Sequence, residues 1–223
     1  SNLGNEAPAL TSFPETLTPP LYPVLVGGLF KLGLMTKLLS FDLSAESLKG
    51  FRVFPADIVI VGFQLSLIVA AAFVVYAWAQ RQFDIGTGIL AVAFFLGTSP
   101  LWSRALEGGS TLLVVFLYAL AGWLFCLGLI RQEESEEASD RAWIFLLTGG
   151  FVLGLAMVVQ TVHFWPCLAA VVLAWFLLRQ GKVALSLGIV LASLMFFAWM
   201  VRLWLVSKNP IGLNWAGGRT RST

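Results

Sequence analysis

Six apolar stretches, almost free of formal charge, dominate this chain between Phe51 and Ser207. The stretches are Ile58–Ala79, Ile85–Leu101, Thr111–Ile130, Ala142–Val162, Phe164–Leu178 and Val183–Val206. At a helical rise of about 1.5 Å per residue, about 20 residues cross a hydrocarbon core of roughly 30 Å. The length and spacing of these apolar stretches therefore predict an all-α, polytopic transmembrane protein in which each stretch is one span.

The composition agrees with a membrane environment. Hydrophobic residues make up 58% of the chain and charged residues 12%, and the mean hydropathy is +0.86. A soluble domain carries roughly 25% charged residues. The net charge of +2 is too small to indicate a nucleic-acid partner. Membrane lipids are therefore the expected surroundings.

The segment Leu21–Leu39 is also apolar, but Lys31 and Lys37 interrupt it. We expect a helix at the membrane surface, where lysine side chains reach water, and a seventh span is the alternative. The chain then divides into an outer-face loop with an interfacial helix over 1–56, a transmembrane helical domain over 57–207 and an outer-face tail over 208–223. The predicted total is six to seven spans.

Basic residues between the spans predict the orientation. The odd-numbered connections hold Arg81, Arg131, Arg141, Arg179 and Lys182, whereas the even-numbered ones hold only Arg104. Because cytoplasmic loops are enriched in Lys and Arg, the odd connections are predicted to be cytoplasmic. Both termini then lie on the outer side, and we expect a further span before Ser1. The charged run Arg131–Arg141 is interpreted as a solvated loop.

One predicted outer loop, Trp102–Ser110, carries an arginine and a carboxylate. Arg104 and Glu107 stand three residues apart, so on a helical turn they share a face and can pair. The pairing has two interpretations. It is a structural surface ion pair, or it is a site where a guanidinium holds phosphate and a carboxylate binds a metal or acts as a base.

Other chemical signatures are sparse. The sequence contains no Walker loop, HExxH or CxxC. Cys126 and Cys167 fall in apolar stretches and are interpreted as small buried hydrophobes. His163 is the only histidine. It is interpreted as a polar residue at a helix turn, with an axial ligand of a haem or chlorophyll pigment as the alternative. The proline-rich stretch Ser12–Tyr22 is a rigid connector on composition alone.

Four stretches of the chain resemble the segments of a known family in their order and spacing. They are Thr18–Pro23 (TPPLYP), Phe51–Asp84, Leu96–Glu107 (LGTSP, then Arg and Glu) and Gly150–Pro166, and the ending Val201–Leu213 adds to them. In order and spacing they resemble the GT-C class of membrane glycosyltransferases, particularly the bacterial relatives of protein mannosyltransferases and of the aminoarabinose transferase. The resemblance covers nearly the whole chain and rests on no single motif.

The resemblance implies a GT-C-like fold in a bacterial inner membrane that transfers a sugar from a polyprenyl-phosphate carrier on the outer face. The cofactor is unknown from the sequence, and it is a divalent metal if the chain is an active glycosyltransferase. It implies Glu107 as a catalytic residue, and Arg104 and Tyr22 as substrate-binding residues. The family's main catalytic acid usually precedes the PPLY segment, where this chain offers only Glu6 and Glu15, neither in a family motif.

The arginine that the family carries before Pro166 is replaced here by the sequence Thr161–Trp165. These departures support a second hypothesis. In this hypothesis the chain is a non-catalytic accessory subunit that has a degenerate form of the fold and packs against other membrane subunits. A pigment or cofactor bound to the subunit is an option within this hypothesis.

Overall fold

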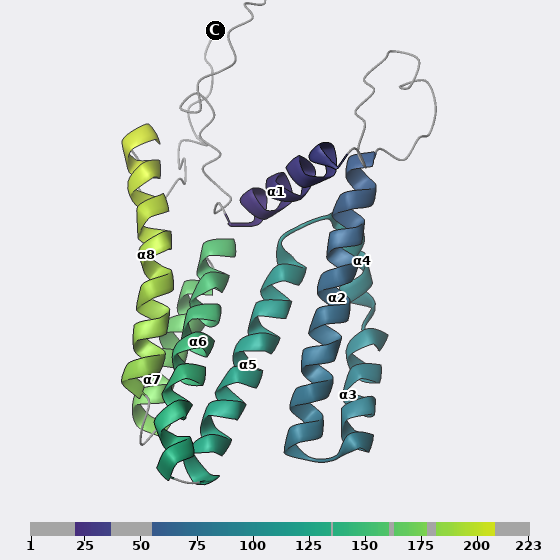
Figure 1. Cartoon of the computed structure of the whole chain (residues 1–223). Coiled ribbons are helices and arrows are strands. Elements are labelled where there is room, and N and C mark those ends of the chain that lie inside the picture. Colours follow the sequence, from purple (N-terminus) through teal and green to yellow (C-terminus); the bar gives the residue numbers. More distant parts are fainter. Residues whose placement is uncertain (1–20, 37–54, 135, 161–162, 178–181, 208–223) are drawn as a thin grey trace, which may run out of the picture.

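The computed structural model describes residues 21–36, 55–134, 136–160, 163–177 and 182–207 (Figure 1). The proline-rich segment before Leu21 and the predicted tail 208–223 lie outside these residues. All the regular secondary structure within them is helical, as predicted. The helices are α1 (Leu21–Met35), α2 (Pro55–Gln82), α3 (Ile85–Gly97), α4 (Ser99–Glu107), α5 (Thr111–Glu134), α6 (Glu136–Val159), α7 (Phe164–Leu177) and α8 (Lys182–Ser207).

Four helices of the described part are long and apolar enough to cross a membrane. Their apolar segments are Asp57–Gln82, Thr111–Arg131, Ala142–Val159 and Val183–Arg202, within α2, α5, α6 and α8. A fifth span results if the bent pair α3 and α4 is counted as one. The structure thus agrees with the predicted helical membrane protein, and it contains four or five of the expected six to seven spans within the described residues.

The surface of the bundle is apolar where that of a soluble protein is polar. Large side chains such as Val69, Phe73, Phe94 and Phe176 are 67% to 83% exposed. Inside the described part, Gln64 is the one polar side chain that is buried. Water would penalise an apolar surface of this extent, whereas lipid chains solvate it well. The distribution fits a bundle surrounded by a bilayer.

Glycines allow α6 and α8 to pack backbone against backbone. A Cβ on Gly188 would meet the carbonyl oxygen of Leu147 and lie 2.7 Å from the backbone nitrogen of Phe151. A Cβ on Gly150 would likewise meet the carbonyl oxygen of Leu185. Small residues at such contacts are how membrane helices gain close packing when no hydrophobic force drives them together.

The predicted second span is broken, and the loop predicted after it is helical. α3 ends at Gly97, Thr98 is extended with φ −77° and ψ 115°, and α4 continues to Glu107 after a bend of 55°. Pro100 lies in the first turn of α4, where its missing N–H costs no hydrogen bond. The side chain of Trp102 donates to the carbonyl of Leu96 at 2.7 Å and so satisfies the end of α3. Ile85–Leu101 is therefore not one straight helix, and Trp102–Ser110 is not a plain loop.

The charged run Arg131–Arg141 is also largely helical rather than a loop. α5 extends through Glu134 and α6 begins at Glu136. Most residues of this run are glutamate, arginine, glutamine or alanine, which are good helix formers. High charge therefore marked the point where the chain leaves the membrane, but not the point where the helix ends.

Besides the bent pair α3 and α4, two helices of the described part are shorter than a membrane crossing. α1 has 15 residues and α7 has 14, so each is about 21–23 Å long at 1.5 Å per residue, against a core of roughly 30 Å. Figure 1 shows α1 lying across the end of the bundle above α5 and α6 rather than within it. This placement favours the predicted surface helix over a seventh span.

The polar turns gather at the two ends of the bundle. In Figure 1 the α2–α3 turn lies at the lower end, together with the end of α5 and the start of α6, and the α4–α5 turn lies at the upper end, close to α1. We call this upper end, which carries Gly108–Ser110, Gln160 and His163, the α4 end. The separation of the turns is the one expected if α3 and α4 together cross the membrane once.

Candidate functional site

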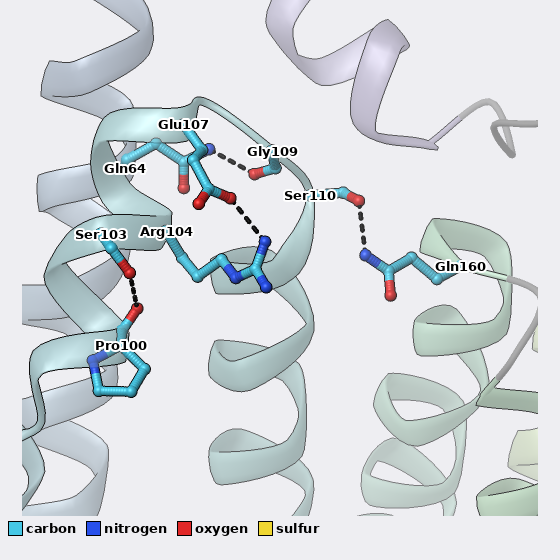
Figure 2. A network of polar contacts seen from close by, with 8 residues as sticks. All are labelled: Gln64, Pro100, Ser103, Arg104, Glu107, Gly109, Ser110 and Gln160. Atoms are coloured by element: carbon cyan, nitrogen blue, oxygen red, sulfur yellow. Dashed lines mark hydrogen bonds and ion pairs between the residues drawn. The ribbon is translucent and has the colours of Figure 1, made fainter.

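The predicted pairing of Arg104 and Glu107 is present on α4. Arg104 Nη1 donates to Glu107 Oε2 at 2.6 Å, across one helical turn (Figure 2). The two side chains are 56% and 53% exposed. An exposed ion pair of this kind contributes less than about 1 kcal/mol to stability. Both groups are therefore free to exchange this contact for one with a ligand at little cost.

Gly108 ends α4 and turns the chain toward α5. Its φ of +67° is left-handed, a conformation that an L side chain adopts only with strain. A Cβ there would also come within 2.9 Å of Ile60 Cγ2 on α2. Glycine at 108 thus sets both the direction of the turn and its close approach to α2.

Tyr22 joins α1 to this turn. Its hydroxyl donates to the carbonyl oxygen of Gly108 and accepts a hydrogen bond from Gln64 Nε2 at 2.8 Å. The partial burial of the ring end raises the pKa of Tyr22 above its ordinary value, although the bond from Gln64 offsets part of this effect. The hydroxyl therefore stays protonated and can donate at any physiological pH.

Gln64, on α2, binds the same turn from the other side. Besides its bond to Tyr22, Nε2 donates to the carbonyl oxygen of Gly109 at 2.6 Å (Figure 2). The side chain is fully buried, and its oxygen Oε1 has no hydrogen-bond partner. Gln64 is not among the residues that the sequence motifs single out. The available signal was a lone amide inside the apolar stretch Ile58–Ala79, since polar residues at such depth usually have a role.

A second set of hydrogen bonds extends across the α4 end to the start of α7. Gln160 Nε2 donates to Ser110 Oγ at 2.8 Å, and Gln160 Oε1 lies 3.2 Å from His163 Nε2. His163 Nδ1 lies 3.0 Å from the hydroxyl of Tyr118. Because an amide oxygen only accepts, Nε2 carries the imidazole proton and Nδ1 accepts from Tyr118.

His163 is therefore a connecting residue in this structure. Desolvation lowers the pKa of His163 below its ordinary value, which favours the neutral ring. Since both ring nitrogens are engaged, an axial metal bond would require one of the two hydrogen bonds to break. The described residues include no group of three or more His, Cys, Asp or Glu placed to hold a metal ion.

The structure thus brings most of the residues that the sequence singled out to one end of the bundle. Tyr22 reaches the turn that directly follows Arg104 and Glu107, and Ser110 in the same turn connects to Gln160 and so to His163. Comparison with protein-family models, curated proteins and solved structures finds no match to this chain. The fold and these contacts define an α-helical protein suited to a membrane, with its polar contacts concentrated at one end.

Proposed function

We propose that this chain contributes the membrane-embedded part of a glycosyltransferase that uses a polyprenyl-phosphate-linked sugar. The observation that supports the proposal is the hydrogen bond from Tyr22 to Gly108. It joins the PPLY segment to the end of the SP…R…E segment, which lie 86 residues apart in the sequence. These are two of the stretches on which the GT-C resemblance rests, and a shared site requires them to meet.

In the proposed reaction, the phosphate of the donor lipid binds Arg104, whose planar guanidinium matches two phosphate oxygens. The phosphate thereby displaces Glu107 from its ion pair. The freed carboxylate takes the proton of an acceptor hydroxyl as the acceptor oxygen bonds to the sugar C1. The bond between C1 and the phosphate oxygen breaks, and the lipid phosphate leaves with the electron pair. Tyr22 keeps α1 against the turn and so borders the site.

The described residues offer too few ligands to hold a divalent metal without the donor. Glu107 supplies one carboxylate, and no group of three potential ligands occurs in the described part. Magnesium can be held by one or two carboxylates together with substrate phosphates, so a site completed by the donor is compatible with this arrangement. We therefore assign no step of the reaction to a metal.

The α4 end is placed on the outer side of a bacterial inner membrane in this proposal. The basic residue Arg81 and the cation–π contact of Arg131 with Phe145, at 4.7 Å, lie toward the opposite end. Basic residues favour the cytoplasmic side. The donor lipid would then reach α4 laterally from the outer leaflet.

The test is sugar transfer by the full-length protein in membrane vesicles, with a radiolabelled polyprenyl-phosphate sugar. Glu107→Gln keeps the size of the side chain but cannot accept a proton as a carboxylate does, and we expect it to abolish transfer. Arg104→Lys keeps the charge but loses the bidentate fork, and we expect weaker donor binding. Asp84→Asn, an exposed acid at the opposite end, is the matched control. Unchanged turnover in Glu107→Gln removes Glu107 from the site.

A second candidate function is a non-catalytic accessory subunit of a larger membrane complex. The observation in its favour is the ion pair itself, because Arg104 and Glu107 already neutralise each other at 2.6 Å, as a purely structural pair would. Purification from native membranes in mild detergent separates the two proposals. A stable assembly with other membrane proteins, without transferase activity, favours the subunit.

A further inference from the structure

A chain of hydrogen bonds with a single direction ends at the α4–α5 turn. The amide Nε2 of Gln160 donates to Ser110 Oγ, and the amide oxygen of Gln160 accepts from His163 Nε2. His163 Nδ1 in turn accepts from the hydroxyl of Tyr118. The direction follows because an amide nitrogen only donates and an amide oxygen only accepts. Ser110 Oγ accepts the last bond and keeps its own hydrogen, so the chain of bonds ends in a hydroxyl donor.

This terminal hydroxyl is accessible. Ser110 is partly exposed, and within the described part of the chain its Oγ takes part only in the bond from Gln160. A Cβ on the neighbouring Gly109 would meet nothing within 4 Å, so the turn borders open space next to Ser110. A ligand at the surface of the turn can therefore reach the hydrogen of Ser110.

We infer that Ser110 binds a phosphate oxygen of the lipid-linked donor, in addition to the contact with Arg104. The inference rests on the proposed function for the identity of the donor. A hydroxyl that has only its hydrogen to offer selects a ligand that accepts, and phosphate oxygens are strong acceptors. Arg104 lies on the helix that leads into the same turn, and in Figure 2 its side chain extends toward the side on which Ser110 and Gln160 lie. The guanidinium then supplies the charge, and the hydroxyl supplies a directional bond.

The groups behind Ser110 prepare its hydroxyl for this bond. In a chain of hydrogen bonds each bond polarises the next, which strengthens the last donor. Tyr118 belongs to α5, Gln160 follows α6 and His163 precedes α7, so three helices hold Ser110 Oγ in place. A donor held in position before the ligand arrives loses little freedom when the ligand binds.

The first measurement tests the direction of the chain of bonds. His163 is the only histidine in the sequence, so nitrogen-15 NMR of the full chain with labelled histidine reports on this ring alone. At a pH where the ring is neutral, we expect the tautomer with the hydrogen on Nε2. The tautomer with the hydrogen on Nδ1 overturns the inference, because the amide of Gln160 would then be reversed and would accept the hydrogen of Ser110.

The second measurement is the affinity of the full chain in lipid nanodiscs for a polyprenyl phosphate. Ser110→Ala should weaken binding about tenfold or more, the loss expected for a hydrogen bond to a charged group. Ser110→Thr keeps a hydroxyl and should bind as the unmodified chain does. Ser103→Ala is the matched control, because the hydroxyl of Ser103 already donates to the carbonyl of Pro100 at 3.0 Å. Equal affinities of Ser110→Ala and Ser103→Ala overturn the inference.

Two further readouts separate this inference from the proposed function. Inorganic phosphate is the second probe, and if it binds as tightly as the polyprenyl phosphate, the lipid is not the ligand and the inference is overturned. If Ser110→Ala weakens binding of the polyprenyl phosphate but the unmodified chain transfers no sugar, the phosphate site is supported and the glycosyltransferase proposal fails. If Ser110→Ala binds the polyprenyl phosphate and transfers sugar as well as the unmodified chain, the inference fails and the proposed function stands.

Discussion

The close packing of α6 and α8 makes Gly188→Ala a demanding test of the fold. The added methyl group would be directed at the backbone of α6, against the carbonyl of Leu147 and 2.7 Å from the nitrogen of Phe151. Ordinary van der Waals contact for a Cβ begins at 3.4 Å. Backbone atoms cannot rotate away as a side-chain end can, so the two helices must separate.

The magnitude follows from two opposing effects. Alanine gains about 1 kcal/mol over glycine in helix propensity. Overpacking a well-packed interior costs about 1–3 kcal/mol, and a rigid backbone obstacle belongs in the upper part of that range. We expect Gly188→Ala to lower the free energy of unfolding by about 1–2 kcal/mol. Gly62→Ala on α2, where a Cβ meets nothing within 4 Å, should instead gain up to about 1 kcal/mol.

The assay is reversible unfolding in mixed micelles of a mild detergent and sodium dodecyl sulfate. The nine tryptophans provide the fluorescence signal. Because both variants replace a glycine within an apolar helix, their difference isolates the packing effect. If Gly188→Ala is as stable as Gly62→Ala, α6 and α8 are not in backbone contact and the described packing is wrong.

Three further changes act at the α4 end. Tyr22→Phe removes both hydrogen bonds of the hydroxyl and should weaken the attachment of α1 by about 1–3 kcal/mol. The measurement is backbone hydrogen exchange in the first turns of α1, which should become faster. Unchanged exchange would show that the hydroxyl does not hold α1. Gly108→Ala should lower the free energy of unfolding by about 1–2 kcal/mol, because residue 108 has a left-handed φ and its Cβ would approach Ile60. In Gly109→Ala the added Cβ meets no atom within 4 Å, so this variant should be nearly as stable as the unmodified chain. Equal stability of the two variants would contradict the turn geometry. Burial lowers the pKa of His163 below its ordinary value of 6.5, so the unfolded chain takes up the proton first as pH falls. The contribution of His163 to stability should therefore be constant well above pH 6.5 and decrease as pH falls through 6.5. The variant His163→Gln should lose this pH dependence in the same unfolding assay, and an unchanged slope would assign it to other groups.

The sequence was sufficient for the helical class because the apolar stretches are long and the charges fall between them. It failed where local preference and hydrophobicity disagree. Arg131–Arg141 is too charged for a membrane, yet its residues favour helix, so the prediction of a loop was wrong. Trp102–Ser110 was taken for a loop because Pro100 interrupts the apolar run, although proline is well suited to the first turn of a new helix.

The candidate site was only half predictable for a different reason. Spacing on one helical turn is enough to pair Arg104 with Glu107, and the structure confirms that pair. The bond of Tyr22 to Gly108 depends on how α1 lies across the bundle, which no local pattern encodes. Gln64 can be recognised in the sequence as an isolated amide in an apolar stretch. Its hydrogen-bond partners, Tyr22 and Gly109, come from distant segments, so the sequence does not predict these bonds.

The proposed function requires that the α4 end of the bundle faces the outer side of the membrane, and cysteine labelling in intact cells tests this requirement most directly. Cys126 and Cys167 are buried, so the unmodified chain should not react with an impermeant maleimide. We predict that Ser103→Cys, on exposed α4, is labelled from outside. Phe83 lies in the turn after α2 and is 76% exposed, so Phe83→Cys should be labelled only after the membrane is opened. Labelling of both positions from the same side would contradict the account, because α3 and α4 would then not cross the membrane.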